Sequence, residues 1–140
     1  MIELPTDLPS FVGMVLKGVE KLDYSWIFRF EDPLFIITEG QWRLISQGRI
    51  VVSGDDHGQQ FGLPAPVDAT DIVRNCIVSS LVQSVKVDDS TGDLFLYFSQ
   101  YTYLQLLQTS AGFESWRAHE ADRETICMGG GEINYVLKDS

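Results

Sequence analysis

The side chains best suited to chemistry lie in one short segment, Gly54-Asp55-Asp56-His57-Gly58-Gln59, which follows an apolar run. Carboxylate and imidazole groups together can bind a metal ion or transfer protons. Glu132 follows a comparable apolar run near the end of the chain, so the candidate ligand or metal residues are Asp55, Asp56, His57 and Glu132. Tight turns also require glycine and aspartate, so an ordinary turn explains the same segment without any ligand.

Two tryptophan–arginine pairs, Trp42-Arg43 and Trp116-Arg117, are the most distinctive repeated feature of the sequence. Glu39 precedes the first pair and Glu114 precedes the second. A tryptophan ring can stack on a ligand while an arginine binds a carboxylate. The alternative is that each Trp packs on the core and each Arg pairs with the nearby Glu. We favour packing, because the pair recurs in both halves of the chain.

The segment 94–103 is unusually aromatic on the face that alternation predicts to point away from the core. The candidate interface residues on and just beyond this face are Phe95, Tyr97, Tyr101 and Tyr103. The corresponding face of an earlier segment carries Ile27, Arg29 and Glu31, which suits water. An aromatic face of this kind is either covered by a helix or forms an interface with a second copy or another protein.

Motifs for covalent or phosphate chemistry are missing from the sequence. It has no Gly-x-Ser-x-Gly, and no Lys-Ser or Lys-Thr follows Gly129-Gly130-Gly131. Cys76 and Cys127 match no zinc pattern, and their apolar neighbours predict buried free thiols. We therefore assign no catalytic residue and no cofactor, and we favour binding over enzymatic activity.

The chain is acidic, with ten Lys and Arg against twenty Asp and Glu, a net charge of −10. An acidic surface repels the phosphates of nucleic acid and attracts a basic protein partner. The amino-terminal residues lack the basic start and apolar run of a signal peptide, and no apolar stretch is long enough to span a bilayer. We expect a cytoplasmic protein that binds neither nucleic acid nor membrane.

Apolar residues with a period of two predict a mainly β (α+β) fold, formed as one domain over 1–140. Trp26, Phe28 and Phe30 share the face expected to lie in the core. One helix is predicted near 68–80, with Asp68 as its cap. Its apolar positions at helical spacing are Ile72, Val73, Cys76, Ile77 and Leu81.

The two halves of the chain match as divergent repeats, over about 11–56 and 77–132, joined by a loop and the helix. Trp26, Phe28 and Phe30 align with Leu94, Leu96 and Phe98, and Phe35 and Ile37 align with Leu104 and Leu106. A meander of three or four strands cannot cover its own apolar face. Two antiparallel meanders packed together therefore predict a sandwich or a partly open barrel, with the helix on an open side.

Several segments resemble a group of small uncharacterised bacterial proteins, a domain of unknown function. They include Trp26-Ile27-Phe28-Arg29-Phe30, Trp42-Arg43-Leu44, the Gly54–Gln59 loop, Thr91-Gly92-Asp93-Leu94 and Gly129-Gly130-Gly131-Glu132. The resemblance implies no activity and no site residues. In size and charge the chain is also similar to acidic immunity proteins that neutralise bacterial toxins, an analogy at the level of general type only.

Three functions are compatible with these observations. The first is a protein-binding module, immunity-like, that binds a basic partner through its acidic surface and the aromatic face. The second is a metal- or small-ligand-binding domain, with hydrolase activity as one form, built on Asp55, Asp56 and His57. The third is a structural homo-oligomer, for example a homodimer. We rank them in this order.

Overall fold

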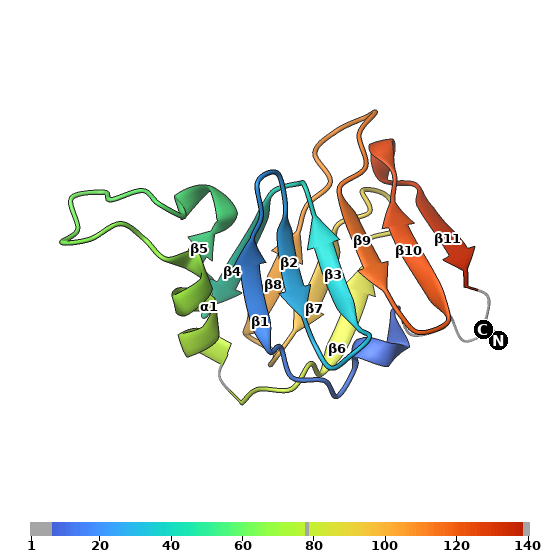
Figure 1. Ribbon diagram of the computed structural model, residues 1–140, viewed down its shortest axis with the longest axis horizontal. Helices are drawn as coiled ribbons and strands as arrows, with labels where there is room; N and C mark the ends of the chain where they lie inside the picture. The colour runs from blue at the N-terminus through green and yellow to red at the C-terminus, as the bar shows by residue number, and fades with distance from the viewer. Residues whose placement is uncertain (1–6, 78, 139–140) are drawn as a thin grey trace.

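A computed structural model describes residues 7–77 and 79–138, which form two antiparallel β-sheets packed face to face (Figure 1). We call them sheet I and sheet II. In spatial order, sheet I contains β1 (Gly18–Lys21), β2 (Trp26–Arg29), β3 (Phe35–Thr38), β9 (Trp116–His119), β10 (Arg123–Cys127) and β11 (Ile133–Leu137). Sheet II contains β5 (Arg49–Ser53), β4 (Trp42–Ser46), β8 (Thr102–Leu106), β7 (Leu94–Tyr97) and β6 (Ser84–Val87). The sheets do not close into a barrel, so the fold is a sandwich.

The alternating apolar residues face the space between the two sheets. Trp26, Phe28 and Phe30 are all buried, which confirms that they form a core face. The ring of Trp42 in sheet II meets Trp26 and Phe28 of sheet I edge to face, with centroids 5.1 and 5.2 Å apart. Such contacts add to the free energy gained by removing large apolar side chains from water.

The strand order contains an internal symmetry, because each repeat contributes three strands to one sheet and two to the other, and β11 follows the second repeat as an added edge strand of sheet I. Strands β1–β3 belong to sheet I while β4–β5 complete sheet II; β6–β8 belong to sheet II while β9–β10 complete sheet I. Strand β3 pairs with β9, and β4 pairs with β8. The linking hydrogen bonds recur: Glu39 N donates to Ser115 O at 3.0 Å, and Leu107 N donates to Gln41 O at 2.8 Å.

The register corrects one detail of the repeat alignment. Trp26 pairs with Thr38 in the first half, and Leu94 pairs with Leu106 in the second. Thr38 therefore corresponds to Leu106, and by the same register Ile36 corresponds to Leu104. The predicted partners Phe35 and Ile37 were shifted by one residue, which in a strand moves a side chain to the opposite face.

Helix α1 (Ala69–Ile77) contacts β1 and β5 and covers the open side of the sandwich between them (Figure 1). The Asp68 carboxylate caps it by accepting a hydrogen bond from Asp71 N at 3.1 Å, as predicted. The helix ends at Ile77, three residues before the expected end. Cys76 is exposed rather than buried, because the buried face of α1 is made by Ala69, Val73 and Ile77.

The three remaining short helices are single turns that position loops. They are η1 (Pro9–Phe11), η2 (Gly54–Asp56) and η3 (Gly129–Gly131). Turn η2 follows β5, and η3 follows β10, so they occupy corresponding places in the two halves. In Figure 1 they lie at opposite ends of the molecule.

We expect Leu104→Ala to lower the free energy of unfolding by about 2–5 kcal/mol, because it leaves a cavity where the two sheets meet. Leu104 is fully buried in β8. The matched control is Leu137→Ala, at a side chain that is 79% exposed, and it should change stability by less than about 0.5 kcal/mol. Urea unfolding of the three proteins measures both effects, and equal losses would contradict the assigned core.

Candidate functional site

The Asp55-Asp56-His57 loop uses two of its three polar side chains to build local structure. Ser53 N donates to Asp56 Oδ2 at 2.9 Å, which closes a capping box over η2. Ala69 N donates to His57 Nδ1 at 3.1 Å, which ties this loop to the start of α1. The His57 ring also packs edge-on against Trp26, with centroids 5.2 Å apart. Asp55 is exposed.

Glu132 does not join this loop. It follows η3, whereas Asp55, Asp56 and His57 follow β5 at the other end of the sandwich (Figure 1). Over the ranges 7–77 and 79–138, no three His, Cys, Asp or Glu side chains gather in a way that would hold a metal ion. The described geometry therefore gives the metal hypothesis no support at this loop.

The two tryptophan–arginine pairs occupy corresponding strand starts, in β4 and β9. Both indole rings are buried, so neither offers a face to a ligand. Trp116 Nε1 donates to Gly92 O at 2.8 Å, whereas Trp42 Nε1 has no partner in the described chain. Arg117 pairs with Glu114 at 2.9 Å, but Arg43 donates instead to Gln105 Oε1 at 2.8 Å. This arrangement favours packing over ligand stacking.

Three of the four candidate interface residues form what we call the aromatic ladder: Phe95, Tyr97 and Tyr103, on the outer face of β7 and β8. The Tyr97 and Tyr103 centroids are 5.0 Å apart, and Phe95 lies 6.3 and 6.1 Å from them. Helix α1 contacts β1 and β5, so it does not cover this face. Tyr101 is 57% exposed in the β7–β8 turn and does not join the ladder.

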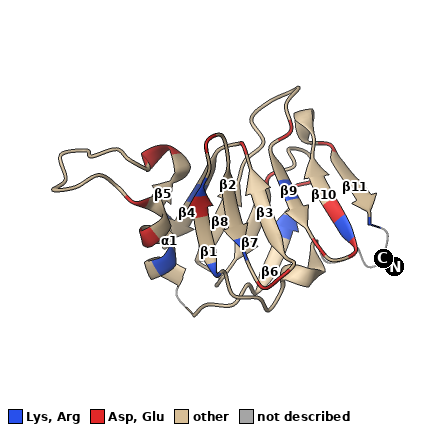
Figure 2. Cartoon of the chain, in the orientation of Figure 1, with Lys and Arg blue, Asp and Glu red and all other residues tan. Residues whose placement is uncertain are grey.

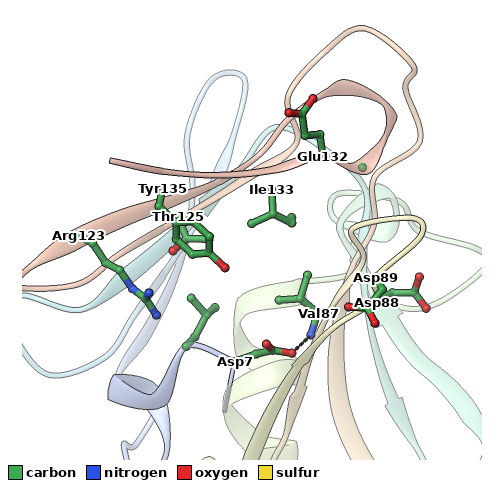
Figure 3. Close-up of a pocket in the computed structure, with 11 residues that line it drawn as sticks. Asp7, Val87, Asp88, Asp89, Arg123, Thr125, Glu132, Ile133 and Tyr135 are labelled. Atoms are coloured by element: carbon green, nitrogen blue, oxygen red, sulfur yellow. Dashed lines mark hydrogen bonds between the residues drawn. The ribbon is translucent and has the colours of Figure 1, made fainter. Parts of the chain in front are cut away.

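A cleft that the sequence did not reveal opens between the edge of sheet II at β6 and strands β10 and β11 of sheet I (Figure 3). Its volume is about 320 Å³. Four carboxylates line it, from Asp7, Asp88, Asp89 and Glu132. The remaining lining residues are Leu8, Val87, Arg123, Thr125, Gly131, Ile133 and Tyr135. We call this site the acidic cleft.

Backbone contacts bring together the three segments that carry the carboxylates of the acidic cleft. Asp7 reaches the end of β6, where its Oδ2 accepts a hydrogen bond from Val87 N at 2.8 Å (Figure 3). Gly131 has φ +93°, and a Cβ there would lie 2.4 Å from the carbonyl oxygen of Thr91. Only glycine permits this approach, which sets the Glu132 backbone beside the β6–β7 turn that carries Asp88 and Asp89.

Asp88 is held in its charged form by its own turn. Its Oδ1 accepts hydrogen bonds from Thr91 N, Ser90 Oγ and Ser90 N, at 2.8–2.9 Å. These donors, with Thr91 N the largest contribution, hold the pKa of Asp88 well below its usual range. The acidic cleft therefore keeps this negative charge into acidic solution.

The described chain contains two free thiols in different environments. Cys127 is buried, as the sequence predicted, and burial raises the pKa of its thiol. Cys76 lies on the exposed side of α1. Neither has the electropositive, partly exposed setting that activates a nucleophilic cysteine.

The fold and its surfaces define a two-layer antiparallel β-sandwich with an acidic cleft on one side and an uncovered aromatic ladder on sheet II. Comparison with protein-family models, curated proteins and solved structures found no match. The resemblance to small bacterial proteins of unknown function thus stays a prediction. None of the helices in residues 7–77 and 79–138 has the length and apolar character needed to cross a bilayer.

Asp88→Asn should lower the thermal midpoint at pH 7, because asparagine carries no charge for the three donors of the turn. A carboxylate whose pKa falls on folding stabilises the native state above its unfolded pKa, and the effect fades as the pH drops. The difference from wild type should therefore shrink below about pH 4. Asp89→Asn, the same change at an exposed neighbour, is the control. A deficit for Asp88→Asn that persists unchanged at pH 3 would contradict the assignment.

Proposed function

We propose that this chain is a cytoplasmic protein-binding module, of the immunity-protein type, that recognises a basic partner. The observation that carries the proposal is the aromatic ladder, three half-buried rings on a sheet face that α1 does not pack against. Large aromatic side chains on an open sheet face are costly in water, and tyrosine, phenylalanine and arginine are the residues enriched at protein interfaces. Arg43 and Gln105 continue the same face beside the ladder.

The ring geometry of the ladder suits a protein partner better than a flat small ligand. Phe95 and Tyr97 stack at 15°, and Tyr97 and Tyr103 tilt at 38°. The three rings pack against one another, so neighbouring rings of the ladder take up part of each ring's surface. A stacked planar ligand needs free ring faces, whereas a protein partner can pack on the outer surface of the whole cluster.

The charge balance supports a basic partner. Twenty acidic side chains face ten basic ones, so the surface carries a surplus of ten negative charges. The surplus raises the rate at which a basic protein is captured and disfavours nucleic acid. In the strand register Lys86 and Arg43 flank the ladder, so the ladder supplies apolar contact and the electrostatic contact falls elsewhere on the surface. Figure 2 shows Asp and Glu residues spread over several elements and turns of the chain.

The test is capture from a lysate of the source cell by the immobilised chain, at low and high salt, read by mass spectrometry. We expect one basic protein retained in stoichiometric amount at low salt and weakened at high salt, since salt screens exposed charges. The double variant Tyr97→Ala/Tyr103→Ala should lose it. Tyr24→Ala, at an exposed tyrosine in the β1–β2 turn, is the control and should retain it.

Either of two results would contradict the proposal. One is that the wild-type chain retains no stoichiometric protein at either salt concentration. The other is that the ladder variant and the Tyr24→Ala control retain the same protein equally, because the ladder would then make no contact with it.

A further inference from the structure

The internal symmetry gives the sandwich two corresponding open sides, and the chain treats them differently. Strands β1 and β5 border one side, which α1 fills. Their counterparts β6 and β10 lie at the other side, where β11 extends sheet I beyond β10 and the acidic cleft opens. Residues Asp7 and Leu8 line part of this second side, and a volume of about 320 Å³ stays open.

We infer that the acidic cleft is the docking site for a lysine- or arginine-bearing segment of the partner protein, which takes the place that α1 takes on the opposite side. The inference rests on the proposed function and adds to it the site and the chemistry of the bound segment. Three separate observations support this inference. They are the charge of the cleft, a buried hydroxyl in its wall and the apolar part of that wall.

The cleft has carboxylates that no cation of its own wall pairs with, and a cationic segment can pair with them. Arg123 is its single cation among the lining residues, and the buried Glu120 already pairs with it at 3.0 Å. The guanidinium also lies over the Tyr135 ring, 5.0 Å from its centroid. Asp7, Asp88, Asp89 and Glu132 thus line the cleft without an internal counter-charge from its wall, and Figure 3 shows the Asp89 and Glu132 side chains at its rim, pointing outward. Charge complementarity selects a basic occupant.

Thr125 provides independent support. It lines the cleft and is 1% exposed, yet its Oγ1 has no hydrogen-bond partner in the described chain. Its counterpart in the first half is Val52. Val52 pairs with Leu44, two residues after Trp42, and Thr125 pairs with Ala118, two residues after Trp116. A buried hydroxyl without a partner is unfavourable. The chain therefore has Val52 on the side that α1 covers, and at the acidic cleft it has Thr125, whose hydroxyl has no hydrogen-bond partner in the described residues.

The apolar part of the wall indicates a protein segment rather than a small cation. Leu8, Val87 and Ile133 line the cleft, and Tyr135 of β11 also lines it. Carboxylates at the rim and apolar groups on the wall match a segment that alternates basic and apolar side chains. A polyamine would leave this apolar wall in contact with water.

The test measures fluorescence anisotropy of the whole chain with a labelled peptide of alternating lysine and leucine, and with a glutamate–leucine peptide as the negative probe. Asp89→Lys/Glu132→Lys should weaken binding of the lysine peptide by about 10-fold or more, through lost attraction and added repulsion. Asp23→Lys/Glu31→Lys makes the same charge change at exposed sites outside the cleft and should bind nearly as wild type.

Thr125→Val supplies a second readout that is independent of net charge. The variant should be at least as thermally stable as wild type, since it removes an unpartnered buried hydroxyl, and it should bind the lysine peptide more weakly. Equal affinity for wild type, the cleft variant and the control would overturn the inference. So would spermine displacing the lysine peptide from wild type at an equal concentration.

The cleft variants also separate this inference from the proposed function. If the wild-type chain and Asp89→Lys/Glu132→Lys retain the same basic protein from the lysate, the inference that the partner binds at the acidic cleft is wrong. The proposed function then stands. If wild type retains nothing, the proposed function fails whatever the peptide does.

Discussion

The apolar face of a three-stranded meander needs a second layer to remove it from water, and the pairing of β3 with β9 and β4 with β8 provides that layer. Through these two pairings each half lends two strands to the other half's sheet. The core, with Trp42 of one sheet against Trp26 and Phe28 of the other, depends on this exchange. The two surfaces proposed for binding, the aromatic ladder and the acidic cleft, are consequences of the same arrangement.

Much of this fold follows from local sequence pattern. Alternation placed Trp26, Phe28 and Phe30 in the core, and the repeated Trp-Arg pair marked two corresponding strand starts, at β4 and β9. Alternation says which face of a strand is apolar but not which strand pairs with it. Two predictions were wrong: the alignment near Ile36, which was shifted by one residue, and the burial of Cys76. Both residues lie where several apolar residues follow one another, so the pattern does not show which face is buried.

The sites were harder to predict, because they depend on contacts between distant segments. The loop at Asp55, Asp56 and His57 has the residue types of a site, but its hydrogen bonds to Ser53 and Ala69 show a structural use for two of its side chains. The acidic cleft combines residues near 7, 88 and 132 that only the tertiary fold brings together. One signal was in the sequence: two consecutive aspartates, Asp88 and Asp89, precede a turn.

The exchange of strands between the halves is tested most directly by cross-strand nuclear Overhauser effects in the labelled protein. We expect backbone contacts between Ile36 and Ala118, from β3 and β9, and between Leu44 and Leu104, from β4 and β8. Contacts between Ile36 and Leu44, with none between the halves, would show that each half pairs its own strands. That result would contradict the exchange and remove the second open side where the acidic cleft lies.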